Sequence, residues 1–276
     1  MITIYFDYDW KMEYSEFKKL TPNKLGIWKN IKIVNKINKA DFIIILQKKS
    51  KKNRIINKNK LLYFQMEPKY ICKKIIYDVY KNFDYINGFH TLTNFVHLKN
   101  NYDNLSRLKY NHRINKLCAI ISAKGKTYGH KLRKKFLIEF CKNNPTIIDV
   151  YGIGWNNNLN GCYKGTIDSK FSILHKYKYT LAFENCELEN YFTEKITDPI
   201  LSLCMPIYWG CSNINKYFPK NSYYFVNLKK YKKCEQQILN IINQEIIPIN
   251  INALLNAKHT ILNNYNIMEV LYNLLN

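Results

Sequence analysis

Short runs of isoleucine, valine, tyrosine and phenylalanine recur along the chain and alternate with amphipathic stretches, and this alternation restricts the fold more than any other feature. Runs of this length and composition are typical of buried strands. In the first half we predict strands at Ile2–Phe6, Ile31–Val34, Asp41–Leu46, Leu61–Gln65 and Tyr85–Phe89. In the second half we predict them at Leu117–Ser122, Ile147–Tyr151, Tyr179–Phe183, Pro206–Trp209 and Tyr224–Val226. Strands that alternate with helices predict an α/β fold.

Apolar residues at helical spacing lie between and after the strands of the second half. We predict helices at His130–Lys142 and Thr193–Leu203, and further helices after Lys230. The polar stretch 100–115 has no clear period and is interpreted as a linker. The sequence therefore predicts two Rossmann-like domains that face a cleft, residues 1–108 and residues 109–276, with helices at the C-terminus. Open α/β sheets bind ligands at the carboxyl ends of their strands, so the cleft is the expected site.

The net charge of +23 raises the possibility of a nucleic acid or an anionic membrane as partner. Only four of the 43 basic residues are arginines: Arg54, Arg107, Arg113 and Arg133. Proteins that read bases favour arginine, because its guanidinium group donates two parallel hydrogen bonds. Lysine, asparagine, isoleucine and tyrosine share A/T-rich codons, so the excess is better explained by an AT-rich genome and a solvated surface. Nucleic-acid binding is kept as a minor alternative.

The eight cysteines form no CxxC pair, and several lie within apolar runs, which is typical of reduced thiols in a cytosolic protein. The sequence also has no visible signal peptide and no apolar run of about 18 residues. We therefore expect a soluble, cytoplasmic protein from a bacterium or a virus, without a membrane span.

Two short motifs are candidate ligand sites. Asp7-Tyr8-Asp9 is a DxD pattern, but it closes the first strand, where a turn is the better interpretation. Gly125-Lys126-Thr127 lacks the earlier glycine of a phosphate-binding loop. The histidines are scattered without metal-ligand spacing. We expect no metal site and no cofactor.

The most informative segment runs from Tyr177 to Gly210: YKYTLAFENCELENYFTEKITDPILSLCMPIYWG. A strand leads through a polar loop to a helix in which Thr193 is the expected N-cap and Glu194 lies in the first turn. The exposed start of a helix beside Lys195 can bind a diphosphate, because its backbone N–H groups point outward. A neighbouring carboxylate can accept hydrogen bonds from the hydroxyl groups of a sugar.

This segment resembles the donor-binding motif of the α-1,3/1,4-fucosyltransferase family, in which a strand ending FEN is followed by five residues and Y-[VF]-T-E-K. Here the motif reads FEN, CELEN, YFTEK, and the family's following P-[IV]-x-x-G strand reads PIYWG. The resemblance continues through SNINKYFPKNSYYFVN and covers about fifty residues. KNFDYINGFH is similar to the family's segment before the domain linker.

Two further stretches carry a weaker resemblance. YFQMEP is similar to the family's [WF]-x-x-E-[SN] stretch, which assigns Glu67 as the general base. Pro68 departs from the small polar residue of the family, which affects the loop shape and the acceptor. HKLRKKFL resembles the stretch whose arginine contacts the donor diphosphate, and this arginine corresponds to Arg133.

The resemblance implies a metal-independent, inverting glycosyltransferase of the GT-B type that moves L-fucose from GDP-fucose to a hydroxyl of a glycan acceptor. It implies that the C-terminal domain binds the nucleotide-sugar donor, and that the N-terminal domain lies on the acceptor side and supplies the base. The predicted donor-binding residues are Arg133, Asn185, Tyr191, Thr193, Glu194 and Lys195. Two other functions stay open: the same fold with another nucleotide-deoxysugar, and an inactive sugar-binding homologue.

Overall fold

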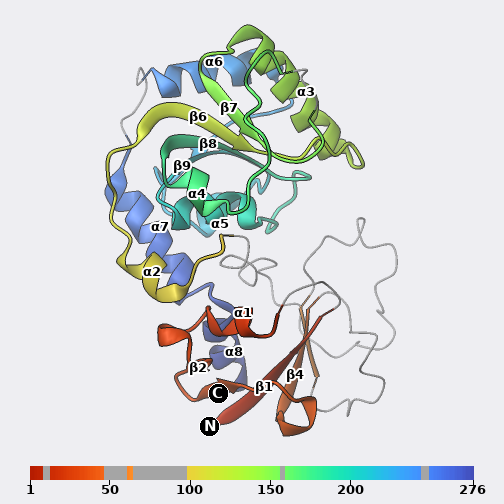
Figure 1. Cartoon of the computed structure of the whole chain (residues 1–276), viewed down its shortest axis with the longest axis vertical. Helices are drawn as coiled ribbons and strands as arrows, with labels where there is room; N and C mark the ends of the chain where they lie inside the picture. Colours follow the sequence, from red (N-terminus) through yellow and green to blue (C-terminus); the bar gives the residue numbers. More distant parts are fainter. Residues whose placement is uncertain (9–12, 47–60, 65–97, 156–158, 244–248) are drawn as a thin grey trace. The chain divides into compact units, whose positions relative to one another are not determined.

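The computed structural model describes residues 1–8, 13–46, 61–64, 98–155, 159–243 and 249–276, in two compact units (Figure 1). Unit 1 contains the described residues before 97 together with 100–106 and 262–276. Unit 2 contains the described residues of 107–261 and the short stretch at 97–99. The chain thus crosses from unit 1 to unit 2 and returns at its C-terminal end.

Unit 1 is built on a five-stranded sheet in the order β2-β3-β1-β4-β5. Its strands are β1 (Ile2–Asp7), β2 (Ile27–Trp28), β3 (Ile31–Ile33), β4 (Phe42–Leu46) and β5 (Leu61–Phe64). All neighbours pair in parallel except β2, which is antiparallel to β3. The run Ile43 to Leu46 is buried on both faces, as expected for a central parallel strand. The four predicted strands within the described residues are confirmed, and Tyr85–Phe89 lies outside them.

Unit 2 is built on a second five-stranded sheet, in the order β10-β9-β8-β6-β7, and every pairing is parallel. Its strands are β6 (Ile114–Ile120), β7 (Ile148–Tyr151), β8 (Tyr177–Phe183), β9 (Met205–Trp209) and β10 (Tyr224–Phe225). In chain order this is the 2-1-3-4-5 arrangement of doubly wound sheets. The direction of winding reverses between β6 and β8, so the carboxyl ends of these two strands form the expected binding edge.

Helices cover both faces of the second sheet (Figure 1). They are α3 (Tyr128–Asn143), α4 (Phe171–Leu174), α5 (Glu194–Leu201) and α6 (Tyr231–Ile242). Helix α5 packs on β8 and β9, and α6 packs on β6. The predicted helical face of α3 is confirmed by the burial of Phe136, Leu137 and Phe140. The two α/β units confirm the predicted fold class.

The predicted linker 100–115 contains the short helix α2 (Tyr102–Arg107). Strand β6 begins at Ile114, near the end of the predicted linker. Helix α1 (Ser15–Lys18) is another short helix of unit 1. The sequence pattern had no period here because α2 has only six residues. Among the helices of the described residues, none is long and apolar enough to cross a membrane.

The C-terminal helices are α7 (Ile251–Asn263) and α8 (Ile267–Leu275). Helix α8 packs in unit 1, where Trp28 Nε1 donates to Glu269 Oε2 at 2.7 Å and Asn266 Nδ2 donates to the carbonyl of Leu20 at 2.9 Å. The sequence division gave all of these helices to the second domain. Helical periodicity shows which face of a helix is apolar, whereas the core that this face covers depends on tertiary structure.

Candidate active site

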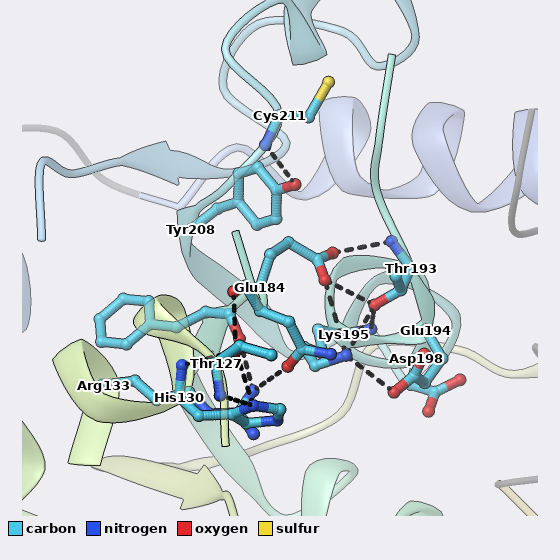
Figure 2. A network of polar contacts seen from close by, with 12 residues as sticks. Thr127, His130, Arg133, Glu184, Thr193, Glu194, Lys195, Asp198, Tyr208 and Cys211 are labelled. Atoms are coloured by element: carbon cyan, nitrogen blue, oxygen red, sulfur yellow. Dashed lines mark hydrogen bonds and ion pairs between the residues drawn. The ribbon is translucent and has the colours of Figure 1, made fainter. Parts of the chain in front are cut away.

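The candidate site lies at the carboxyl edge of the second sheet, where β6 and β8 are neighbours. The loop after β6 leads into α3, and the loop after β8 leads into α5. Two helix N-termini therefore begin at the same edge. Figure 2 shows the polar side chains of both loops in one network. Backbone N–H groups at helix starts carry partial positive charge, so this edge favours an anionic ligand.

Thr193 is the N-cap of α5, as predicted from the sequence. Its Oγ1 accepts from the backbone N–H of Lys195 at 3.3 Å. Its own backbone N–H donates to Glu184 Oε1 at 2.7 Å, and its hydroxyl donates to Glu184 Oε2, also at 2.7 Å. One carboxylate thus fixes both polar groups of the cap. The direction in which α5 begins is consequently set by Glu184, the residue directly after β8.

Glu184 is completely buried. Burial raises the pKa of its carboxyl group, while the nearby Lys195 ammonium and the two hydrogen bonds from Thr193 act in the opposite direction. Gly210, at the end of β9, makes room for this side chain. A Cβ at position 210 would lie 2.3 Å from Glu184 Cγ and 2.8 Å from the Tyr208 hydroxyl oxygen. The glycine of the PIYWG motif is therefore required by close packing against Glu184.

Lys195 lies in the first turn of α5, and its side chain is 21% exposed. Its Nζ is 3.2 Å from Glu194 Oε1 and 3.5 Å from Glu184 Oε2. Burial alone would lower the pKa of Lys195. The negative charges of Glu194 and Glu184 outweigh this effect, so the pKa of Lys195 is raised. The ammonium group therefore stays protonated at neutral pH. It can offer charge to a ligand at the edge while Glu184 and Glu194 hold it in place.

Arg133 projects from α3 to the loop after β8. It is buried, and its Nη1 donates to Asn185 Oδ1 at 2.8 Å and to the carbonyl of Phe183 at 3.3 Å. The backbone of the same loop also touches the start of α3. A Cβ at Gly129 would lie 2.0 Å from the Asn185 carbonyl oxygen. The absence of a side chain at Gly129 thus allows α3 to start against the strand end that carries Asn185.

His130 and Thr127 form a capping box at the start of α3. The Thr127 side chain accepts from the His130 backbone N–H, and His130 Nδ1 accepts from the Thr127 backbone N–H, both at 3.3 Å. Burial, followed by the positive charge of Arg133 and of Lys195, lowers the pKa of His130 to about 4. Two lysines of the preceding loop, Lys124 and Lys126, act in the same direction. The imidazole is therefore neutral at pH 7, surrounded by positive charge.

A second ion pair lies one turn further along α5. Lys170 Nζ is 2.7 Å from Asp198 Oδ2 and 3.8 Å from Glu194 Oε1. Asp198 is 1% exposed, and its Oδ1 has no hydrogen-bond partner in the described part of the chain. Burial raises the pKa of Asp198 to about 7, although Lys170 opposes this shift. Glu194 therefore lies between two lysines, Lys195 and Lys170, which limit the directions its carboxylate can take.

The structure brings together most of the predicted donor residues. Arg133 and Asn185 form one hydrogen-bonded pair, and Thr193, Glu194 and Lys195 form a second group around Glu184, the residue directly before Asn185 (Figure 2). Tyr191 lies in the same loop, but its side chain is fully buried. Glu67 lies outside the described residues, as does Asp9. Asp7 ends β1 of unit 1 and is buried, and no group of three or more metal-ligating side chains occurs among the described residues.

Sequence reasoning did not assign roles to several residues of this network: Glu184, Gly210, Gly129, His130, Lys170 and Asp198. Glu184 and Gly210 were present in the quoted motifs, and only their contacts show why a carboxylate and a glycine occur at these positions. The capping box of Thr127 and His130 uses an imidazole in place of the usual Glu or Gln, so its sequence signature was absent.

The network combines two cationic side chains with two helix N-termini at one strand edge. Such an arrangement stabilises negative charge that develops on a leaving group, because the donors are already oriented before the reaction. The chemistry that fits is the binding of a phosphate or diphosphate group and the departure of a diphosphate.

Comparison with known proteins points to the same part of the chain. Residues 110–246 match the model described as glycosyltransferase family 10 (fucosyltransferase), C-terminal part. This range contains β6 to β10 and every described residue of the network. The matched family is the one that the FEN and YFTEK motifs resemble.

Individual relatives match over shorter stretches. The chain is 39% identical over 72 residues to an α-(1,3)-fucosyltransferase of Helicobacter pylori, covering 26% of this chain and 15% of the relative. It is 34% identical over 96 residues to GDP-fucose protein O-fucosyltransferase 3 of Xenopus laevis, covering 34% of this chain and 16% of the relative. The matches thus span about a sixth of the length of these curated relatives.

A crystal structure of an α1,3-fucosyltransferase with GDP-fucose aligns with a TM-score of 0.49 and 18% sequence identity. The alignment covers 94% of this chain and 81% of that chain.

Proposed function

The chain belongs to glycosyltransferase family 10 (fucosyltransferase) through residues 110–246, and from this premise we propose that it transfers L-fucose from GDP-fucose to a hydroxyl group of a glycan acceptor. The observation that carries the proposal is the network at the carboxyl edge of β6 and β8. It lies within the matched range, and its cations suit a nucleotide diphosphate. The name of the Helicobacter relative supports fucose as the transferred sugar.

The diphosphate of the donor would bind between Arg133, Lys195 and the N–H groups that begin α5. Negative charge grows on the diphosphate as the bond to fucose breaks, and these groups would stabilise it without a metal ion. Glu194, held between Lys170 and Lys195, would accept hydrogen bonds from the ribose or stabilise the positively charged fucosyl group. Asn185 orients Arg133, and Tyr191 is a fully buried residue of the same loop.

In the proposed step, the acceptor hydroxyl oxygen attacks C1 of fucose from the face opposite the diphosphate. The bond between C1 and the diphosphate oxygen breaks, and its electron pair leaves with GDP. The proton of the acceptor hydroxyl passes to Glu67, which acts as general base. This direct displacement inverts the configuration at C1. A positioned base typically contributes about 10²- to 10⁴-fold to the rate.

We also propose a reducing compartment, the cytosol, as the place of action. Six of the seven described cysteines are buried free thiols: Cys118, Cys141, Cys162, Cys204, Cys211 and Cys234. Free, buried thiols are typical of proteins in reducing compartments. The proposed partners are a GDP-sugar and a glycan or glycoconjugate, without a cofactor.

A donor panel tests the proposal. Turnover of GDP-fucose, other GDP-sugars, UDP-sugars and dTDP-sugars is measured as release of the nucleotide diphosphate in the presence of a mixture of glycans. We expect GDP-fucose to give the highest kcat/KM. Preferred turnover of another nucleotide-deoxysugar would favour the second candidate donor, which the same network would also bind. Turnover of none of them, with GDP still bound, would indicate an inactive sugar-binding homologue.

The role of Glu67 is tested separately with Glu67→Gln, which keeps the size and polarity of the side chain but removes the proton acceptor. We expect transfer to fall about 10²-fold or more while the affinity for GDP-fucose is unchanged. Unchanged transfer per folded molecule, with only a lower melting temperature, would refute the assignment. The base would then be sought among the other N-terminal carboxylates, Asp7 and Asp9 first.

A further inference from the structure

A cavity of about 330 Å³ lies at the opposite, amino-terminal edge of the second sheet. It is lined by the residues that precede β6 and β8, and the two segments are joined where the Ile114 N–H donates to the Lys176 carbonyl at 2.8 Å. Strands β6 and β8 have seven residues each, so they separate this edge from the network around Lys195 by about 20 Å. The cavity is therefore distinct from the proposed donor site.

The side chains around this cavity are strongly basic. Lys109, His112, Arg113, His175 and Lys176 line it, and neither residues 107–116 nor residues 169–178 contain an aspartate or a glutamate. The acidic residue just before the second segment, Asp168, is 97% exposed and pairs with Lys99. Positive charge is thus concentrated around one hollow without acidic side chains interspersed.

The guanidinium group of Arg113 is buried without a carboxylate partner among the described residues. Arg113 is 6% exposed, and it donates from Nη1 to the Leu174 carbonyl at 3.0 Å and from Nη2 to the Ser202 carbonyl at 2.9 Å. Its Nε has no partner among those residues, and burial lowers its pKa. Removing a charge from water is costly unless an opposite charge compensates it. An anion in the adjacent cavity would supply that compensation.

A second buried cation lies beside the same segment. Lys258, on α7, is 4% exposed, and its Nζ donates to the carbonyl of Leu108 at 2.8 Å. Leu108 lines the cavity. Burial lowers the pKa of Lys258 to about 8, and no carboxylate contributes to this shift. Two buried positive charges are therefore held close to one hollow that is open to ligands.

We propose that this cavity binds a small phosphate monoester. The phosphate group would lie between Lys109 and Lys176, which are exposed and can turn their ammonium groups toward it. The guanidinium group of Arg113, which also lines the cavity, would add a third positive charge. The apolar side chains of Leu108 and Ile114 would contact the organic part. A cavity of about 330 Å³ is at the lower end of the range for small-molecule sites, which excludes a large ligand.

The test uses the whole chain and follows the imidazole NMR signals of His112 and His175 during titration with inorganic phosphate and with glycerol 3-phosphate. Sodium chloride at matched ionic strength is the blank, and His130 reports separately on the other edge of the sheet. We expect saturable shifts of His112 and His175 with both phosphates and tighter binding of glycerol 3-phosphate. Shifts of equal size with chloride would refute the site.

The double variant Lys109→Gln/Lys176→Gln should weaken phosphate binding about two- to thirtyfold, because two exposed charges that would pair with the phosphate are removed. The matched control is Lys232→Gln/Lys233→Gln on α6, which removes the same charge from two exposed positions and should bind as the wild type does. Equal weakening in both variants would show a general charge effect and overturn the proposal. Shifts of His112 and His175 by a short single-stranded oligonucleotide, but not by either phosphate, would also overturn it in favour of a polyanion.

Discussion

Arg133 on α3 donates a hydrogen bond of 2.8 Å from Nη1 to the side-chain oxygen of Asn185, and so joins the helix after β6 to the loop after β8. This helix and this loop follow β6 and β8, the two neighbouring strands between which the winding of the second sheet reverses. Asn185 therefore orients the side chain of Arg133. Its neighbour in sequence, Glu184, accepts hydrogen bonds from Thr193 and pairs with Lys195. Adjacent residues of the FEN motif thus organise two sides of the proposed anion site.

Removal of either cation should weaken donor binding and slow transfer. We expect Arg133→Ala and Lys195→Ala each to lower kcat/KM for GDP-fucose about ten- to a hundredfold, because charge-assisted hydrogen bonds contribute about 1.5–3 kcal/mol. Lys232→Ala, at an exposed position of α6, is the control. Melting temperatures are recorded for each variant, because Arg133 is buried. Kinetics like those of the control in both variants would remove these residues from the donor site.

Glu184→Gln should disturb the start of α5. The amide of glutamine presents an N–H where Thr193 now donates, so one buried hydrogen bond is replaced by two donors facing each other. We expect the free energy of unfolding to fall by about 1–3 kcal/mol and the affinity for GDP to fall with it. Glu187→Gln is the matched control, because Glu187 pairs with the half-exposed Lys229. If the two variants unfold at the same denaturant concentration, Glu184 does not hold the cap.

Gly129→Ala should separate α3 from the strand end. The added Cβ would overlap the Asn185 carbonyl, and overpacking of this kind costs about 1–3 kcal/mol. Gly125→Ala, four residues earlier, meets nothing within 4 Å and should change stability by less than about 0.5 kcal/mol. Chemical denaturation measures both variants. Similar stability of the two proteins would show that close approach at Gly129 is unimportant.

Transfer should persist in excess EDTA, because the proposed charge stabilisation comes from Arg133, Lys195 and two helix N-termini. The assay compares initial rates before and after chelation, with manganese added back as the control. Loss of activity that manganese restores would contradict the metal-independent proposal and would direct attention to Asp7 and Asp9.

The strands and the cap of α5 could be predicted from the sequence, because both depend on local patterns. Thr193 precedes an apolar helical run, and the strand runs are rich in β-branched residues. Lys195 and Arg133 were identified through the family motifs, and the structure places them in one network with Asn185. The pairing of β6 with β8 was not predictable from these patterns, because strand order depends on contacts distant in sequence.

The residues that sequence reasoning missed act through tertiary contacts. The role of Asp198 depends on Lys170, which lies 28 residues earlier, and only packing brings the two together at 2.7 Å. No sequence pattern reveals why position 210 is a glycine. It is required because the Glu184 side chain occupies the space that a Cβ at position 210 would need. The return of α8 to unit 1 likewise depends on which core its apolar face meets.

His130 offers a direct reading of the charge at the site. Its pKa of about 4 lies below the ordinary value of about 6.5, so the unfolded chain binds more protons than the folded chain between these pH values. Its contribution to stability is therefore present above pH 6.5 and is lost as pH falls toward 4. In Lys195→Ala, one source of positive charge is gone, and we expect the pKa of His130 to rise.

An NMR pH titration of His130 with and without saturating GDP-fucose tests where the donor diphosphate binds. A diphosphate bound between Arg133 and Lys195 adds negative charge close to the imidazole, so we expect the pKa of His130 to rise from about 4 when the donor binds. Guanosine, which lacks the phosphates, should leave it unchanged. A pKa that is the same with and without GDP-fucose would contradict the placement of the donor diphosphate at this edge of the sheet.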